Sequence, residues 1–167
     1  MNLDSLRDLL IRWCHQNSGS EHIAGLEAMR GLLAAEFGTL PDAAIEHVAL
    51  RDTPAKALRI RVRPEAPVQF LCSGHYDTVY GADHPFQTCS QPEADLLRGP
   101  GVADMKGGLV VMLAALRQLE QSPAAQNVGY EVLLTPDEET GSHGSAPAIA
   151  ESATRHRFAL VFEPAAR

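Results

Sequence analysis

The sequence predicts an α/β fold in which helices flank a largely parallel, doubly wound sheet. Two apolar stretches at helical spacing open the chain, and three short apolar runs without alternation follow them, separated by helical segments. Strand, helix, strand, helix, strand is the order typical of such a sheet. With 167 residues, of which 45% are hydrophobic, the chain is long enough for one domain with a sizeable core.

The first forty residues are expected to form two helices. Leucines recur at helical spacing from Leu3 to Trp13, and the polar segment 17–20 interrupts them. Apolar residues at the same spacing resume at Ile23 and continue until Gly38. Both segments should therefore present one apolar face to the core.

A hairpin is expected next, because the period of the pattern changes to two. Leu58, Ile60 and Val62 alternate with arginines at positions 59, 61 and 63, which predicts a strand with one solvated face. This strand should pair with residues 45–50 across the turn at 52–54.

The lengths of the apolar runs predict the remaining strands, and helices are expected between them. Residues 68–72, 130–134 and 158–162 are short, mostly apolar runs, which suit strands buried on both faces of a parallel sheet. Residues 105–121 and 142–152 are predicted to be the helices between them.

Each of these three strands leads directly into polar residues. The first continues into Ser73-Gly-His-Tyr-Asp77, the second into Thr135-Pro-Asp-Glu-Glu139, and the third into Glu163. A glycine-rich turn with Asp104 precedes a predicted helix. Ligands bind outside the carboxyl ends of the strands in open α/β sheets, so we expect these four groups to share one site.

The residue types in these groups favour a metal site. One His-x-Asp pair or one acidic run is more often an ordinary loop, but four such groups in order at strand ends make coincidence improbable. Imidazole and carboxylates without thiolates suit zinc, cobalt or manganese, and the number of acids favours two ions sharing a carboxylate. His75 and Asp77 point the same way on an extended strand, so Asp77 can orient the imidazole. Glu138 and Glu139 diverge, so one can bind metal while the other serves as a base.

Two nucleotide-binding alternatives are disfavoured. The turn Gly99-Pro-Gly101 resembles the start of a dinucleotide-binding loop, but Asp104 stands where that fingerprint requires glycine. The phosphate-loop pattern GxxxxGK[ST] is absent from the sequence.

Together the four groups resemble the successive signatures of the M20 metallopeptidases, most closely those of the glutamate carboxypeptidase-like group. The matching motifs span residues 70–164, and they are Gly74-His-Tyr-Asp-Thr-Val79, Gly99-Pro-Gly-Val-Ala-Asp-Met-Lys-Gly-Gly108, Thr135-Pro-Asp-Glu-Glu-Thr-Gly-Ser142 and Phe162-Glu-Pro164.

The resemblance implies a role for each acidic residue and for the histidine. It implies a peptide bond after Asp104 that is often cis. The implied roles are His75, Asp104 and Glu163 on one zinc ion, Asp104 and Glu139 on a second, Asp77 orienting His75, and Glu138 as general base and then acid.

The expected activity is hydrolysis of an amide or peptide bond by a water held between two zinc ions, with Co²⁺ or Mn²⁺ as other possible metals. The substrate would be a peptide or an N-acyl amino acid. Residues 1–167 would be the N-terminal portion of the catalytic domain, without the lid and dimerisation domain through which a full-length form would make a homodimer. The last ligand of the second zinc would also be missing, which predicts a competent first site and a weak second one.

Two alternatives stay open: a metal-binding fragment without turnover, and a deacylase of small N-acyl amines. The net charge of −7 and the scattered lysines and arginines argue against nucleic-acid and membrane partners. Three well-separated cysteines and a polar N-terminus without a signal-peptide pattern favour a cytoplasmic location.

Overall fold

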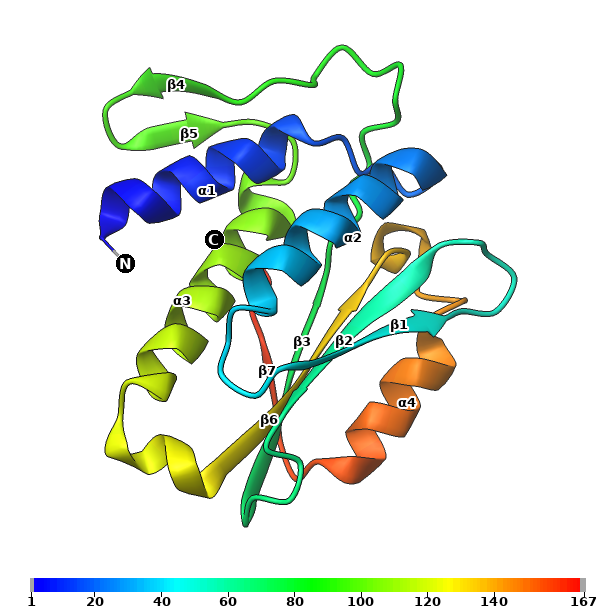
Figure 1. Ribbon diagram of the computed structural model, residues 1–167. Helices are drawn as coiled ribbons and strands as arrows, with labels where there is room; N and C mark the ends of the chain where they lie inside the picture. Colours follow the sequence, from blue (N-terminus) through cyan, green and yellow to red (C-terminus); the bar gives the residue numbers. More distant parts are fainter. Residues whose placement is uncertain (1, 166–167) are drawn as a thin grey trace.

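The computed structural model describes residues 2–165, which form a five-stranded sheet with helices on both faces (Figure 1). The strand order is β1-β2-β6-β3-β7. The strands are β1 (Ala44–Ala49), β2 (Lys56–Val62), β3 (Val68–His75), β6 (Val128–Thr135) and β7 (Ala159–Val161).

The direction of the strands fixes where the site lies. β3 runs parallel to both β6 and β7, whereas β1 pairs with β2 and β2 with β6 in the antiparallel sense. In the parallel part, His75 is the register partner of Thr135, and Ser73 is the partner of Val161. The carboxyl ends of β3, β6 and β7 therefore meet at one edge, and the predicted fold class is confirmed.

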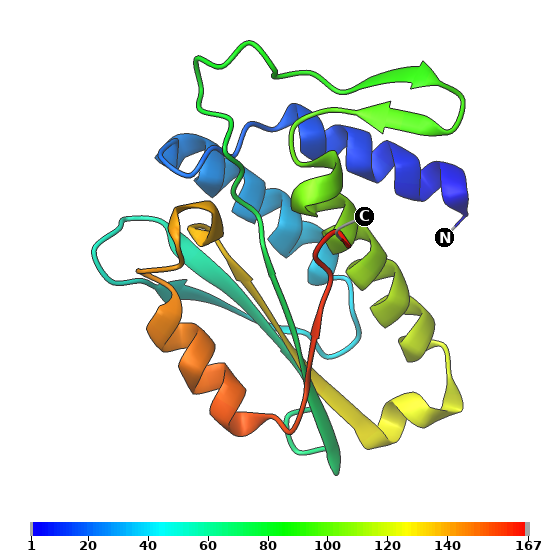
Figure 2. The same ribbon diagram turned by 180° about the vertical axis from the view of Figure 1, so that it is seen from behind.

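Helices cover the sheet from both sides (Figures 1 and 2). α1 (Leu3–His15), α2 (Ile23–Phe37) and α3 (Gly108–Glu120) share one buried cluster with the apolar side chains of β2 and β6. On the opposite face, Ile149 of α4 (Ala146–Arg155) packs against Ala57, Leu71 and Leu133. This is the two-sided covering that a doubly wound sheet needs.

Short elements complete the chain. Three helical turns are η1 (Val102–Gly107), η2 (Pro123–Asn127) and η3 (Glu138–Thr140), and an exposed hairpin consists of β4 (Ser90–Glu93) and β5 (Leu96–Arg98). The sequence did not predict this hairpin, because strands of four and three residues are too short to show a period.

Two helices begin later than predicted. α3 starts at Gly108 rather than at 105, because Asp104 and Met105 have non-helical backbone angles. α4 starts at Ala146 rather than at 142, because the residues after η3 form turns.

The expectation that the strand at 158–162 is buried on both faces is wrong. β7 pairs with β3 alone among the described strands, so it lies at the edge of the sheet. Leu160 and Val161 are 45% and 60% exposed.

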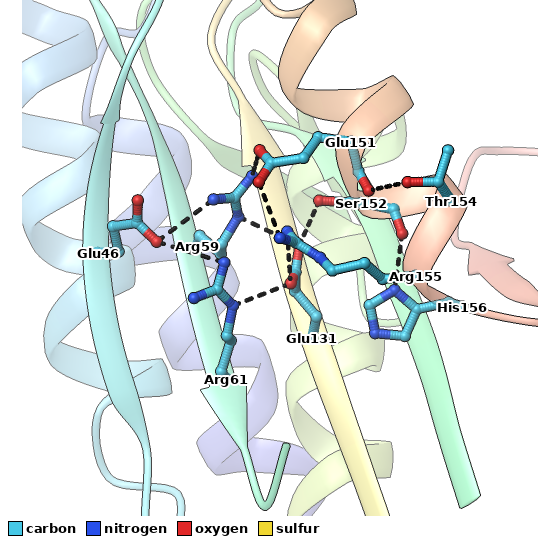
Figure 3. A network of polar contacts seen from close by, with 9 residues as sticks. All are labelled: Glu46, Arg59, Arg61, Glu131, Glu151, Ser152, Thr154, Arg155 and His156. Carbon is cyan, nitrogen blue, oxygen red and sulfur yellow. Dashed lines mark hydrogen bonds and ion pairs between the residues drawn. The ribbon is translucent and has the colours of Figure 1, made fainter. Parts of the chain in front are cut away.

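The expectation of a solvated face on β2 is also wrong at Arg59. The side chain of Arg59 is only 3% exposed, because α4 covers that face of the sheet. Its guanidinium forms ion pairs with Glu46, Glu131 and Glu151, and Figure 3 shows these carboxylates around it.

Across residues 2–165, no helix is both long and apolar enough to cross a membrane.

Candidate metal centre

The predicted site residues come from four segments that meet at the carboxyl edge of the parallel strands. His75 is the last residue of β3, and Glu138 and Glu139 lie in η3 just after β6. Glu163 follows the end of β7 by two residues, and Asp104 lies in η1. The topology therefore brings together residues that are up to 88 positions apart in the sequence.

Carboxylates surround the Nε2 atom of the buried His75. Nε2 lies 2.9 Å from Oδ1 of Asp104, 3.6 Å from Oε2 of Glu163 and 3.7 Å from Oε2 of Glu138. One ligand atom each from His75, Asp104 and Glu139 lie within 4.8 Å of one another. All the acids expected to face the metal lie around this imidazole, and their side chains are partly exposed on the open side.

Asp77 lies behind this group, and its side chain is fully buried. Its Oδ1 is 3.2 Å from Nδ1 of His75 and accepts a hydrogen bond from the backbone N–H of Glu138. Its Oδ2 accepts hydrogen bonds from the backbone N–H of Glu139 and from Oγ of Ser20. Asp77 thus contacts His75 and the backbone of both glutamates, and its orienting role stays a prediction.

The glycine-rich turn before α3 holds Asp104 in place. Gly101 has a φ of 73°, which favours glycine, and its carbonyl accepts a hydrogen bond from the backbone N–H of Lys106 at 2.8 Å. The peptide bond between Asp104 and Met105 is cis, as the family resemblance implied. The Sδ atom of Met105 accepts a hydrogen bond from the backbone N–H of His75. The turn is therefore attached directly to the end of β3.

Close packing brings Glu163 to the same place. A Cβ atom at Gly108, the first residue of α3, would lie 2.1 Å from the carbonyl oxygen of Phe162. Only glycine allows the start of α3 to approach the chain beside Glu163 this closely.

The electrostatics of the site favour a bound cation. Burial lowers the pKa of His75, but the hydrogen bond and charge of Asp77, with Glu163 and Glu138, raise it to about 9. Burial raises the pKa of Glu139, and the negative charges of Asp104, Asp77 and Glu138 add to this effect. Burial and the negative charges of Asp104 and Glu138 likewise raise the pKa of Glu163. Like charges held this close destabilise one another unless a proton or a metal ion lies between them.

The donor set fits a divalent metal such as zinc. Ligand bonds to zinc are about 2.0–2.2 Å long, which places neighbouring nitrogen and oxygen ligands roughly 3–4 Å apart. The distances from Nε2 of His75 to Asp104 and Glu163 are of this size. When the ring is neutral, an Nδ1–H donated to Asp77 leaves the lone pair of Nε2 on the side of the carboxylates.

Two residues near the site were not predicted. Ser20, in the segment predicted only as a break between helices, donates to Asp77. Lys106 is fully buried, and its Nζ donates to the carbonyls of Trp13 and Gln16 at the end of α1. These contacts join segments far apart in the sequence, and no local spacing predicts them.

Comparisons with known proteins identify the family of the chain. Residues 71–165 match the model of peptidase family M20/M25/M40. The chain is 36% identical over 108 residues to carboxypeptidase G2 of Pseudomonas sp. (strain RS-16), which covers 62% of the chain and 25% of that protein. It is 33% identical over 143 residues to acetylornithine deacetylase of Proteus mirabilis (strain HI4320), which covers 83% of the chain and 36% of that protein.

The fold resembles that of solved structures as well. The M20 family metallo-carboxypeptidase Sso-CP2 from Sulfolobus solfataricus superimposes with a TM-score of 0.73 at 19% identity, over 97% of this chain and 37% of that one. The chain spans from a quarter to just over a third of the length of the two curated relatives named above. The matched segment contains His75, Asp104, Glu139 and Glu163, and it is more than half of the chain. The chain therefore belongs to peptidase family M20/M25/M40.

Proposed function

We propose that this chain carries the metal-binding part of a hydrolase of amide or peptide bonds. The observation that supports this proposal most directly is the convergence of Asp104, Glu138, Glu139 and Glu163 around Nε2 of a buried histidine. Structural acids are normally paired with lysine or arginine, but these face one another and His75.

A bound metal ion and Glu138 would have separate roles in the proposed reaction. A bound divalent ion would polarise the substrate carbonyl and lower the pKa of an attacking water. Glu138 is half exposed and lies 3.7 Å from Nε2 of His75, so it stands beside the metal position and open to substrate. We assign Glu138 as the base that takes a proton from water and returns it to the leaving amine.

We propose two zinc positions of unequal affinity. His75, Asp104 and Glu163 would hold the first ion, and Asp104 would share the second with Glu139. Among the described residues this gives three protein ligands to the first ion and two to the second. Zinc sites with three protein ligands are the usual catalytic arrangement, so the first position should bind more tightly.

The proposed substrate is a peptide cleaved at its last bond or an N-acyl amino acid. The likeness to carboxypeptidase G2 favours this class. The likeness to acetylornithine deacetylase supports a second candidate, a small N-acyl amine. A panel of peptides and N-acyl compounds, assayed for release of free amine, would separate the two.

The zinc content of the purified protein tests whether the chain binds metal at the proposed site. Purified protein reconstituted with zinc should contain about one tightly bound ion per chain, and Glu163→Ala should lose it. Glu65→Ala is the matched control, because Glu65 is an exposed acid in the turn before β3, at the opposite end of that strand from His75. Wild-type protein that binds no zinc after reconstitution would overturn the proposal, and two equally tight ions would overturn the unequal affinities.

A further inference from the structure

The connection between α1 and α2 lies outside the segment that matches the family model, yet it reaches the metal centre. The family match begins at residue 71. Ser20, in this connection, donates a hydrogen bond from Oγ to Oδ2 of Asp77 at 2.7 Å. This acceptor is the fully buried carboxylate that also contacts His75 and the backbone of both glutamates of η3.

Backbone contacts hold the connection in register with the chain that follows Asp77. Gly19 forms a parallel bridge with Thr78, whose backbone N–H donates to the carbonyl of Ser18 at 2.9 Å. The backbone N–H of Ser20 donates to the carbonyl of Thr78 at 3.2 Å. A Cβ atom at Gly19 would lie 2.5 Å from the carbonyl oxygen of Tyr80, so glycine permits this close approach. Ser20 is thus fixed by its backbone before its hydroxyl contacts Asp77.

The side chain of Asn17 strengthens the same attachment. Its amide nitrogen donates to the carbonyl of Tyr80 at 3.0 Å and to the side chain of Gln87 at 2.7 Å. Its amide oxygen accepts from the backbone N–H of Gly19 at 3.0 Å. Asn17 therefore connects both sides of the contact and limits the freedom of Ser20.

Ser20 supplies one of the four hydrogen-bond partners of the Asp77 carboxylate. Oδ1 faces His75 and the N–H of Glu138, while Oδ2 receives the N–H of Glu139 and the hydroxyl of Ser20. Without that hydroxyl, Oδ2 would keep one donor, and the buried carboxylate would lose one of its hydrogen bonds. The carboxylate would then be freer to rotate. The His75 ring and the η3 backbone, which both contact it, would be held less firmly relative to each other.

We propose that Ser20 is a positioning residue of the metal centre. Through Asp77 it holds His75 and η3 so that Nε2 and the Glu139 carboxylate face the same point. This inference rests on the proposed metal site and extends it to a segment that the family match does not cover.

The chain offers a matched control two residues away. Ser18 is fully buried in the same connection, and its Oγ has no hydrogen-bond partner among the described residues. Ser20→Ala and Ser18→Ala therefore remove the same atom from the same segment, and only the first breaks a contact with Asp77. Ser20→Thr, in contrast, retains a hydroxyl at position 20.

The test is titration of each variant with Co²⁺, followed by the visible absorption spectrum and by the dissociation constant. Ser20→Ala should weaken cobalt binding roughly 10-fold and alter the spectrum, a loss at the lower end of that seen for residues that orient metal ligands. Ser20→Thr should recover most of the affinity, and Ser18→Ala should stay within about two-fold of wild type. Urea unfolding of each variant checks that all remain folded.

A second measurement needs no metal. In metal-free protein, the backbone amide resonances of Glu138 and Glu139 should shift in Ser20→Ala and stay in place in Ser18→Ala. Unchanged cobalt affinity, or amide shifts equal in both alanine variants, would overturn the role of Ser20. Wild-type protein that binds no cobalt, while the amides shift only in Ser20→Ala, would overturn the proposed function and leave the contact through Asp77 supported.

Discussion

The Nδ1 atom of His75 lies 3.2 Å from Oδ1 of Asp77, on the side of the ring away from Asp104. In the neutral ring, this contact favours the proton on Nδ1 and leaves the lone pair of Nε2 for a metal ion. The other three hydrogen-bond partners of Asp77 are also N–H or O–H donors, so this position requires a side chain that only accepts hydrogen bonds.

Asp77→Asn should therefore damage the site although it preserves the shape of the side chain. An amide would present N–H groups to partners that are themselves donors. We expect metal affinity to fall about 10- to 100-fold. The free energy of unfolding should fall by about 1–3 kcal/mol, because buried donors lose their acceptor. Competition with a chromogenic chelator and urea unfolding would measure the two effects, with the exposed Asp83→Asn as control. Unchanged affinity would show that the carboxylate does not orient His75.

Metal affinity should depend steeply on pH. The pKa of His75 is about 9, so an incoming ion must displace a proton from the ring below that pH. The raised pKa values of Glu139 and Glu163 act in the same direction. We expect apparent affinity to rise by up to about tenfold per pH unit and to level off above pH 9. Calorimetric titration in buffers of different ionisation enthalpy would detect the released protons. A flat profile between pH 6 and 9 would contradict the prediction.

Lys106 should give stability the opposite dependence on pH from His75. Burial lowers the pKa of Lys106 from 10.5 to about 8, so the unfolded chain binds more protons between those two values. Its contribution to stability should rise across that window with a slope of up to about 1.4 kcal/mol per pH unit. His75, with its pKa raised from 6.5 to about 9, contributes stability below pH 6.5 that is lost as pH rises through 9.

The contribution of Lys106 to the free energy of unfolding can be separated from that of His75 by comparing wild type with a variant that lacks the lysine. The stability of wild type minus that of Lys106→Met, measured by urea unfolding in chelator at pH 7 to 10.5, isolates the lysine. Matching slopes in the two proteins above pH 8 would show that folding does not lower the pKa of Lys106.

The base assigned to the reaction is open to a direct test. Glu138→Gln should retain zinc and lose roughly 10²- to 10⁴-fold in kcat, because an amide cannot accept the proton from water. Release of free amine from N-acyl amino acids measures the rate, and elemental analysis measures the zinc. Full activity in the variant would move the base to another residue. Loss of zinc together with activity would make Glu138 a ligand.

The sequence was sufficient to predict the parts of the fold and site that depend on local patterns. Short apolar runs predicted β3 and β6, and the polar residues after β3, β6 and β7 predicted where the candidate site residues meet, because parallel strands deliver their carboxyl ends to one edge. Ser20 and Lys106 could not be found this way. Ser20 contacts a residue 57 positions away and Lys106 contacts residues 90 and 93 positions away, and no period connects such partners.

Burial was mispredicted where it depends on which element covers a face. A period of two separates the faces of β2 but does not say that α4 lies over Arg59. The apolar run of β7 does not say that the strand is at an edge of the sheet. Both errors concern tertiary neighbours, which the local sequence does not encode.

The ion-pair network under α4 leads to the last prediction (Figure 3). The side chains of Arg59 and Glu131 are each 3% exposed, with Nε and Oε1 separated by 3.2 Å. Ser152 donates a hydrogen bond to Oε1 of Glu131, and Arg61 pairs with Oε2 at 3.1 Å. Glu46 is the matched contrast, because it pairs with the same arginine but is 49% exposed.

Glu131→Ala should lower the free energy of unfolding by about 3–5 kcal/mol, because it leaves a buried guanidinium without its buried partner. Glu46→Ala should cost at most about 1 kcal/mol, since an exposed ion pair is well solvated without its partner. Arg59→Met combined with Glu131→Leu should recover most of the loss, because both charges leave together. Urea unfolding at constant pH measures all three variants. Equal costs for the two alanine substitutions would mean that water reaches Arg59 and that α4 does not seal this face of the sheet.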